Sequence, residues 1–403
     1  MVHKIASVTL LTALFSVLIL QIFNKSKLKH PYADLTIQEL VEKYEYPVEV
    51  HNVTTEDGYI LTLHRIPHGK ENLSQNRTPV LFLPGVLQGA WDFVQNGPNQ
   101  SLSFILSEKG YDVWLGNVRG TTLSRKHETL DPDKDLAFWD FTIEEIGVYD
   151  LPALIDYVLE TTGESSLHYV GFSQGTTVFF LMGSERSEYL SKVKLMSALG
   201  PAVFMENPKS PIVQFIADNW KLGEVLFGFF NYQELFGIND PMTMYVKYIC
   251  NDENSIFINL CMHHFSMALG DNYDAADKST LSLMTSKSPC GASLRQIIHI
   301  YQMIDSGNFC KYDFGTRRNL EIYGQETPPL YNLSKVTVPV ALYYSTNDWV
   351  IDITNMDRLE KTLPNVVKRY KVPLEKFNHG DFLFAKDVVG LLYNTVIDEI
   401  SKY

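Results

Sequence analysis

The chain has 403 residues, of which 45% are apolar and 20% are charged, with 24 Gly and 18 Pro. This composition indicates a globular protein with a sizeable core and excludes disordered, collagen-like and polytopic membrane classes. The 47 acidic and 34 basic side chains give a net charge of −13, so we expect no nucleic-acid partner, because a phosphate backbone would be repelled. Four cysteines without C-x-x-C spacing and eleven histidines without an H-E-x-x-H motif predict no metal site.

The N-terminal region has the features of a secretory chain. Residues Ile5 to Phe23 form one mostly apolar run after Lys4, so we interpret residues 1–23 as a signal peptide. An uncleaved membrane anchor and a buried core helix are the alternatives, because the run is long for a cleaved signal and lysines follow it. Sequons for N-glycosylation occur at Asn24, Asn52, Asn72, Asn76, Asn99 and Asn332. The last five are the glycosylation candidates, and we expect a secreted or lysosomal protein.

Oxidising surroundings would allow cysteines to pair. Cys250 and Cys261 lie in one short segment, and a small closed loop forms easily, so we expect a disulfide between them. Cys290 and Cys310 flank Ala292–Ile304, which has the pattern of a helix, and a helix of that length separates its ends by roughly 20 Å. A disulfide needs Cα atoms within about 7 Å, so we expect these two thiols to be free and buried.

Short apolar runs alternate along the chain with longer amphipathic segments. Tyr46–Ile66 has the pattern of a β-hairpin around Glu56-Asp57-Gly58 and is predicted to lie at the edge of a sheet. Continuous apolar runs, which are typical of buried parallel strands, follow at Pro79–Leu83, Tyr111–Leu115, Leu167–Val170, Val193–Leu199, Val338–Tyr344 and Tyr370–Phe377. Asp150–Leu159 and Val388–Ile400 have helical periodicity. The pattern predicts an α/β fold with a mostly parallel central sheet.

The alternation stops between about Ala202 and Thr327, where the sequence is helical without strand-like runs. We interpret residues 202–327 as an insertion that divides the core into residues 24–201 and 328–403. Large apolar side chains crowd into its first part, namely Phe215, Trp220, Leu222, Leu226, Phe227, Phe229, Phe230, Leu235 and Phe236. Two interpretations are open: they form a small core of the insertion itself, or they face a substrate channel.

One motif predicts a nucleophile. Gly171-Phe172-Ser173-Gln174-Gly175 is a G-x-S-x-G sequence, with a predicted strand running into it and a predicted helix, Thr176–Leu181, running out of it. A sharp strand-to-helix turn admits only small neighbours, which explains the two glycines, and it lifts the serine hydroxyl above the sheet. Ser173 is therefore the candidate nucleophile.

A serine hydroxyl needs a base to take its proton, and the base needs an anion to orient it. After this kind of turn, the acid and then the histidine follow the serine on loops at the carboxyl ends of late strands. Asp348 follows the strand Val338–Tyr344, Asp352 is its rival, and His379 is the only histidine downstream of Asp348. The structural alternatives are a turn carboxylate that bonds its own backbone and a histidine that caps the final helix. The order of the three residues favours catalysis.

An acyl-transfer site also needs two N–H groups that bind the oxyanion. Gln174, directly after the nucleophile, supplies one. We assign the other to Val86 in the glycine-containing loop Pro84–Gly89 after an early strand, because Pro84 has no N–H. The alternative is a simple strand-ending turn.

Several long motifs, in the same order, are similar to those of the acid lipase family, which includes gastric lipase, lysosomal acid lipase and many insect lipases. They are the hairpin around Glu56–Tyr59, Gly110–Gly120, Tyr149–Ala153, Gly171–Thr177, Ser345–Trp349 and Asn378-His379. The resemblance implies an α/β-hydrolase fold in which Ser173, Asp348 and His379 form the triad and Val86 and Gln174 donate to the oxyanion. It also implies that the insertion is a helical cap with a mobile lid, and that Cys250 and Cys261 form the cap disulfide.

The sequence departs from many members of that family at two positions. Pro84 and Phe172 stand where relatives carry histidine. Neither change removes a proposed catalytic group, so the reaction carries over more safely than the substrate preference or the pH optimum.

The expected function is hydrolysis of neutral-lipid esters, triacylglycerols or sterol esters, through an acyl-enzyme and without a cofactor. The aromatic insertion favours long acyl chains, because each buried methylene contributes about 0.8 kcal/mol. The expected partners are lipid esters at a lipid–water interface. A short-chain carboxylesterase and a lipid-binding protein without turnover on the same fold are the alternatives.

Overall fold

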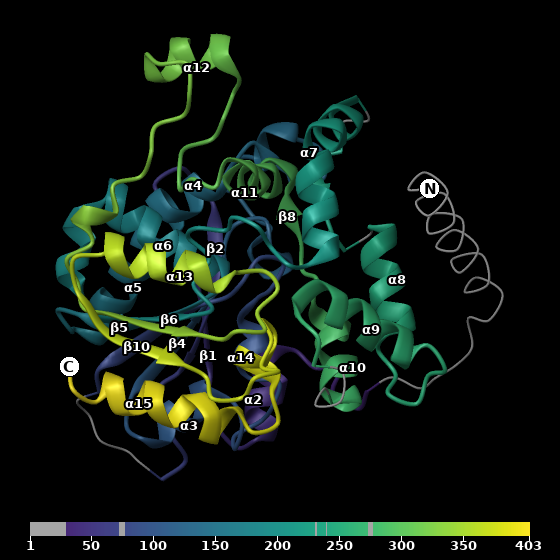
Figure 1. The fold of residues 1–403 in the computed structure, drawn as a ribbon. Coiled ribbons are helices and arrows are strands. Elements are labelled where there is room, and N and C mark those ends of the chain that lie inside the picture. The colour runs from purple at the N-terminus through teal and green to yellow at the C-terminus, as the bar shows by residue number, and fades with distance from the viewer. Residues whose placement is uncertain (1–29, 72–76, 230–231, 239, 273–276) are drawn as a thin grey trace.

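The computed structural model describes residues 30–71, 77–229, 232–238, 240–272 and 277–403 (Figure 1). The predicted signal peptide, residues 1–23, and the sequons at Asn24, Asn72 and Asn76 lie outside these residues. Within them, no helix combines the length and the apolar character that a membrane span needs.

Among the described residues, the centre of the protein is an eight-stranded sheet with the strand order β1-β2-β4-β3-β5-β6-β9-β10. The strands are β1 (Glu49–Thr54), β2 (Ile60–Ile66), β3 (Pro79–Leu83), β4 (Asp112–Gly116), β5 (Leu167–Phe172), β6 (Val193–Leu199), β9 (Val340–Tyr344) and β10 (Val366–Lys371). β2 pairs antiparallel with β1 and with β4, and the other neighbours pair parallel. The predicted α/β class, the mostly parallel sheet and the hairpin at its edge are confirmed.

The register of the central strands brings their carboxyl ends together. Leu83 at the end of β3 is the partner of Gly171 in β5, and Phe172 in β5 is the partner of Leu199 in β6. Leu199 is in turn the partner of Tyr343 in β9. The loops after β3, β5, β6 and β9 therefore leave the sheet on the same side, at the carboxyl ends of the strands. In open α/β sheets, ligands bind outside these ends.

Helices cover both faces of the sheet (Figure 1). α5 (Leu151–Thr162), α6 (Gln174–Glu185) and α13 (Ile353–Thr362) cover one face, and α3 (Leu102–Glu108) and α15 (Asn394–Ile400) cover the other. α2 (Ile37–Lys43) has the same length as α3 and α15, and α4 (Ile143–Glu145) and α14 (Asp381–Phe384) are shorter. A π-helical turn, Val389–Tyr393, precedes α15. Strands β3, β4 and β5 are buried along their whole length between these layers, which explains their continuous apolar runs.

The last strand lies upstream of the predicted one. β10 ends at Lys371, so the prediction of a strand over Tyr370–Phe377 was wrong apart from its first two residues. β10 is an edge strand and only partly buried, so charged residues interrupt its apolar pattern. The apolar residues Val372 and Phe377 are buried instead in the connection that leads to His379.

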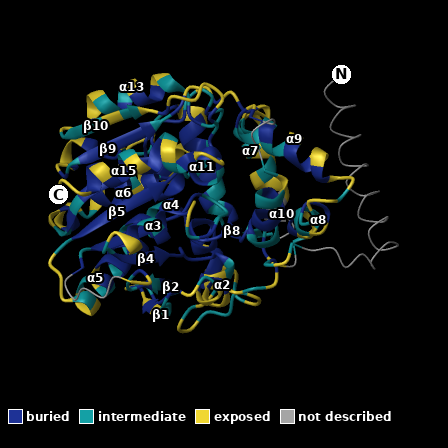
Figure 2. Ribbon diagram, turned by 90° about the horizontal axis from the view of Figure 1, so that it is seen from below, coloured by how far each residue is buried: buried dark blue, intermediate teal, exposed yellow. Residues whose placement is uncertain are grey.

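Helices dominate residues 202–327, and Figures 1 and 2 show α7 to α10 gathered on one side of the sheet. The helices are α7 (Pro211–Phe229), α8 (Pro241–Ile249), α9 (Ile258–Leu269), α10 (Lys278–Lys287), α11 (Leu294–Ser306) and α12 (Thr316–Tyr323). The expectation of no strands here was wrong, because β7 (Glu234–Leu235) and β8 (Ala292–Ser293) pair antiparallel. β8 takes the first residues of the predicted helix, so α11 begins at Leu294.

The four cysteines divide into one pair and two single thiols. Cys250, directly after α8, and Cys261 in α9 form a disulfide with an S–S distance of 2.05 Å. Cys290 and Cys310 are free and buried. The disulfide ties together two helices that each expose apolar side chains.

Candidate active site

Ser173 lies at the sharp turn between β5 and α6. Its backbone has φ 50° and ψ −117°, a conformation that L-residues rarely adopt, and its N–H donates to the Leu199 carbonyl at 3.0 Å. A Cβ atom on Gly171 would lie 2.9 Å from the Gly175 carbonyl oxygen, and one on Gly175 would lie 2.2 Å from the Leu83 carbonyl oxygen. Both glycines of the motif are therefore required by the close approach of backbone to backbone.

The structure brings Ser173, Asp348 and His379 together. His379 Nε2 is 2.9 Å from Ser173 Oγ, and His379 Nδ1 is 2.7 Å from Asp348 Oδ2. All three residues are buried, with exposures of 7%, 3% and 5% in chain order. Burial strengthens such a chain of hydrogen bonds because water does not compete for it. The order and the distances are those of a serine activated by an oriented base.

The loop after β9 holds Asp348 in place. Asp348 Oδ1 accepts hydrogen bonds from the N–H groups of Val350 and Ile351, each at 2.9 Å, which leaves Oδ2 for His379. The rival Asp352 caps α13 and forms an ion pair with Lys209 at 3.0 Å. Its carboxylate is thus committed to the helix N-terminus rather than to the histidine.

Apolar rings enclose the imidazole of His379. The ring of Phe172 lies 5.1 Å from it between centroids, at an interplanar angle of 33°, and the ring of Phe382 lies edge-on at 6.4 Å. Gly200 leaves room for the imidazole, since a Cβ atom there would be 3.2 Å from His379 Cε1. The departure at Phe172 therefore changes the wall beside the base and leaves the triad intact.

The two expected oxyanion donors follow adjacent strands. Val86 lies three residues after the end of β3, and Gln174 begins α6, where the first N–H groups of a helix have no partner within it. The side chain of Gln174 is also fixed, because its Oε1 accepts a hydrogen bond at 2.7 Å from Gln296 Nε2 in α11. Both glutamines are buried.

The insertion also holds the loop that contains Val86. Leu87 has a positive φ of 61°, and its carbonyl oxygen accepts from the N–H of Cys290 at 3.0 Å. Asp92 Oδ2 accepts from the N–H of Gly89 at 3.1 Å and from Ser288 Oγ at 3.0 Å. These hydrogen bonds fix the backbone of the loop, so it is more than a simple strand-ending turn.

Sequence reasoning missed the residues behind His379. Asp381 Oδ2 accepts from the N–H of Asn378 at 2.8 Å, and Asn378 Oδ1 accepts from the N–H of Asp381 at 3.1 Å. Asn272, 109 residues earlier in the chain, donates to the same Asp381 oxygen. The spacing of Asn378 and Asp381 is typical of a side-chain-closed turn and could have revealed that pair, but nothing in the sequence points to Asn272.

Comparisons with known proteins identify the family of this chain. A model of the α/β-hydrolase fold matches residues 78–385, and a model of a partial α/β-hydrolase lipase region matches residues 37–97. Lipase 1 of Drosophila melanogaster is 40% identical over 369 residues, which cover 91% of this chain and 80% of that protein. The chain belongs to the acid lipase family of α/β hydrolases.

Other members of the acid lipase family match with similar coverage. Human gastric triacylglycerol lipase is 34% identical, and the alignment covers 94% of each chain. The lysosomal acid lipase/cholesteryl ester hydrolase of Macaca fascicularis is also 34% identical, with 93% of this chain and 92% of that protein covered. The crystal structure of a candidate lipase from Sulfolobus solfataricus has a TM-score of 0.57 at 15% identity, covers 88% and 94% of the two chains, and shares the fold. The predicted family and α/β-hydrolase fold are confirmed.

The described part of the chain holds no group of three or more His, Cys, Asp or Glu residues that could bind a metal ion.

Proposed function

We propose that this chain is a lipase that hydrolyses neutral-lipid esters, triacylglycerols or sterol esters, through an acyl-enzyme. One observation carries the proposal, namely the hydrogen-bonded chain from Asp348 Oδ2 through His379 to Ser173 Oγ. The substrate class is supported by the names of two relatives, a triacylglycerol lipase and a cholesteryl ester hydrolase.

The first half of the reaction forms the acyl-enzyme. Ser173 Oγ attacks the ester carbonyl carbon while His379 Nε2 takes the hydroxyl proton. Asp348 holds the Nδ1–H of His379 and stabilises the imidazolium that forms. The N–H groups of Val86 and Gln174 bind the oxyanion, and His379 then gives its proton to the alcohol, which leaves.

The second half releases the fatty acid. The oxygen of a water molecule attacks the acyl carbon while His379 Nε2 takes a proton from that water. The tetrahedral intermediate again places its negative charge on the two N–H groups. Collapse of the intermediate breaks the bond to Ser173 Oγ, which recovers its proton from His379.

The surface of α7 supports action at a lipid–water interface. Its exposed apolar residues have exposures between 36% and 68%; they are Ile212, Phe215, Ile216, Leu222, Val225 and Leu226. The interpretation of Phe215, Leu222 and Leu226 as a small buried core was therefore wrong, although Trp220 and Leu235 do pack against one. Exposed apolar patches mark interaction surfaces, and we infer that this one contacts lipid.

We further propose that residues 202–327 form the cap and lid over a core made of residues 24–201 and 328–403. Their helical content supports this division. The disulfide and the exposed positions of Asn52, Asn99 and Asn332 support passage through the secretory pathway, toward secretion or the lysosome.

The test is release of fatty acid from emulsified triolein and from a sterol ester between pH 4 and 8, with purified wild type and Ser173→Ala. We expect the wild type to release fatty acid and Ser173→Ala to release none. Equal rates in the two proteins would overturn the assignment of Ser173. Activity on short soluble esters alone would identify a carboxylesterase, and bound lipid without turnover would identify a binding protein.

A further inference from the structure

The last residue of α9 and the three residues that follow it contact both loops of the triad. We call Leu269–Asn272 the α9 clasp. The carbonyl oxygen of Leu269 accepts hydrogen bonds from the N–H of His379 at 3.1 Å and from the N–H of Trp349 at 3.2 Å. Trp349 directly follows Asp348 in the chain. One carbonyl group of the insertion thus joins the backbone that carries the acid to the backbone that carries the base.

The next two residues of the α9 clasp add contacts to the same loops. Asn378 Nδ2 donates to the carbonyl oxygen of Gly270 at 2.9 Å, and Asn347 Nδ2 donates to that of Asp271 at 3.1 Å. Gly270 has φ 129°, and a Cβ atom there would lie 2.2 Å from the Asn347 carbonyl oxygen. The backbones therefore approach so closely that only glycine fits.

The last residue of the α9 clasp, Asn272, binds a buried carboxylate. Asn272 Nδ2 donates to Asp381 Oδ2 at 2.5 Å, and the N–H of Asn378 donates to the same oxygen at 2.8 Å. Asn272 is 2% exposed and Asp381 is 8% exposed, so water cannot easily replace a lost donor. The Asn272 amide thus acts on the turn Asn378–Asp381, in which His379 is the second residue.

We propose that Asn272 is a positioning residue for His379. The role rests on the proposed function, in which His379 is the base. Without the amide, the Asp381 carboxylate loses one of its two neutral donors, and the turn that orients the imidazole relaxes. An error of about 1 Å in the position of a catalytic group costs on the order of 100-fold in rate. The loss falls on the chemical step, because Asn272 acts through the turn and not through the exposed apolar surface of α7.

The first test compares Asn272→Ala with Asn259→Ala, which makes the same change at an exposed position of α9. The measured quantities are kcat and KM on a soluble short-chain ester and on emulsified triolein. We expect Asn272→Ala to lower kcat by about 10- to 100-fold on both esters with little change in KM, and Asn259→Ala to match wild type. A wild-type kcat, or a loss confined to triolein, would overturn the positioning role.

A second variant, Asn272→Asp, keeps the size of the side chain and gives a readout that altered packing alone would not produce. Above the pKa of the new pair, two carboxylates face each other and repel. At lower pH one of them takes a proton, and its O–H can replace the N–H of Asn272. The neighbouring titratable groups are Asp271 in the α9 clasp, Asp348 and Asp352 after β9, and Glu375, Lys376 and His379 before Asp381. All of them are common to variant and wild type.

We therefore expect the kcat of Asn272→Asp, relative to wild type, to rise at least about tenfold as the pH falls from 8 to 5. A pH-independent ratio would overturn the role of the hydrogen bond. Ser173→Ala, measured alongside, separates the two proposals. Full activity in that variant contradicts the proposed function, whereas an inactive Ser173→Ala beside a wild-type Asn272→Ala contradicts only the positioning role.

Discussion

The carbonyl oxygen of Leu83 lies 2.2 Å from the point that a Cβ atom on Gly175 would occupy. Because Gly175 has no Cβ atom, the end of β3 can lie this close to the start of α6. β3 leads into the loop of Val86, and α6 begins with the N–H of Gln174. In Gly175→Ala the two backbones must move apart, which separates the two N–H groups that we propose bind the oxyanion. We expect kcat/KM on a soluble ester to fall by at least about 100-fold, the effect of losing one oxyanion donor.

Gly390→Ala is the matched control, because a Cβ atom at Gly390 would meet nothing within 4 Å. It should leave kcat/KM unchanged. A Gly175→Ala enzyme with wild-type kcat/KM would show that the close approach of β3 and α6 has no part in the site.

The two acids after β9 should respond differently to the loss of a charge. Asp348→Asn keeps the shape of the side chain but no longer favours the tautomer of His379 with a proton on Nδ1, and it cannot stabilise the imidazolium. We expect kcat to fall by roughly 10³- to 10⁴-fold. Asp352→Asn keeps a residue that caps α13 well and should leave kcat unchanged. Steady-state kinetics on a soluble ester provides the comparison, and equal losses in the two variants would contradict the assignment.

The sequence predicted those parts of the fold and the site that depend on neighbouring residues. The strands β3 and β5 are buried on both faces, so their apolar runs identified them, and the glycines around Ser173 are dictated by a turn five residues long. The order of Ser173, Asp348 and His379 then sufficed to select the triad candidates.

The parts that escaped prediction depend on distant contacts. β10 lies at the edge of the sheet and is only partly buried, so it lacks a continuous apolar run, and the predicted strand was displaced toward the buried Phe377. β7 and β8 are two residues long and exist only because they pair with each other. Asn272 meets Asp381 through the tertiary fold alone, since 109 positions separate them in the sequence.

Arg119 should be among the most important residues for stability. Its buried guanidinium donates to Asp57 through Nη1 and Nη2, at 2.6 and 2.8 Å, and to Asp150 through Nε at 2.7 Å. Burial opposes ionisation of Asp57, but the hydrogen bonds and charge of Arg119 outweigh it and lower the pKa of that carboxyl. Arg119→Met would leave two carboxylates without their counter-charge, and we expect a loss of about 3–5 kcal/mol in the free energy of unfolding.

Urea unfolding at pH 7 measures this loss. Arg317→Met provides the control, because the Arg317 side chain is 95% exposed and the change should stay within about 0.5 kcal/mol. Similar free energies for the two variants would show that the buried network contributes little.

The exposed apolar face of α7 should matter for emulsions and not for dissolved esters. Val225 and Leu226 are 68% and 50% exposed, so replacing both by serine removes apolar area without opening a cavity. We expect the rate on emulsified triolein to fall severalfold at limiting interface, because less apolar surface is available for adsorption. The rate on a soluble short-chain ester should not change, and parallel losses on both substrates would contradict a surface role.

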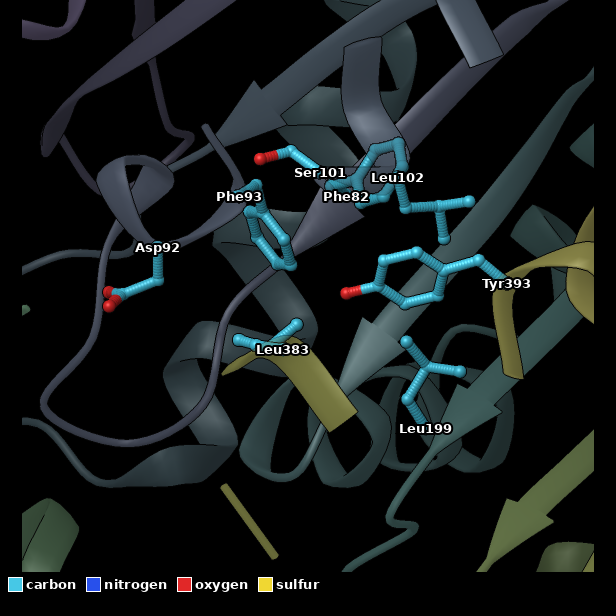
Figure 3. Close-up of a pocket in the computed structure, with 8 residues that line it drawn as sticks. All are labelled: Phe82, Asp92, Phe93, Ser101, Leu102, Leu199, Leu383 and Tyr393. Atoms are coloured by element: carbon cyan, nitrogen blue, oxygen red, sulfur yellow. The ribbon is translucent and has the colours of Figure 1, made fainter. Parts of the chain in front are cut away.

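Asp92 has a buried carboxylate that accepts hydrogen bonds from two neutral groups, the N–H of Gly89 and the hydroxyl of Ser288. It lies beside a small cavity, which Figure 3 shows lined also by Phe82, Phe93, Ser101, Leu102, Leu199, Leu383 and Tyr393. Burial raises the pKa of Asp92 from its ordinary value of 3.8 to about 7, although the hydrogen bonds oppose the change. The folded protein therefore holds a proton on Asp92 at pH values where the unfolded chain has released it.

This difference makes folding favour acid conditions at this position. The stability that the protonated Asp92 contributes is complete below about pH 4, declines as the pH rises, and is lost above about pH 7, up to about 4 kcal/mol in total. Asp92→Asn has a neutral side chain at every pH and should escape that decline. We expect the free energy of unfolding of the variant, minus that of wild type, to increase by several kcal/mol between pH 4.5 and pH 7.5 in urea titrations. Groups that titrate alike in both proteins cancel in this difference, so a constant value would mean that Asp92 is ionised in the folded protein at both pH values.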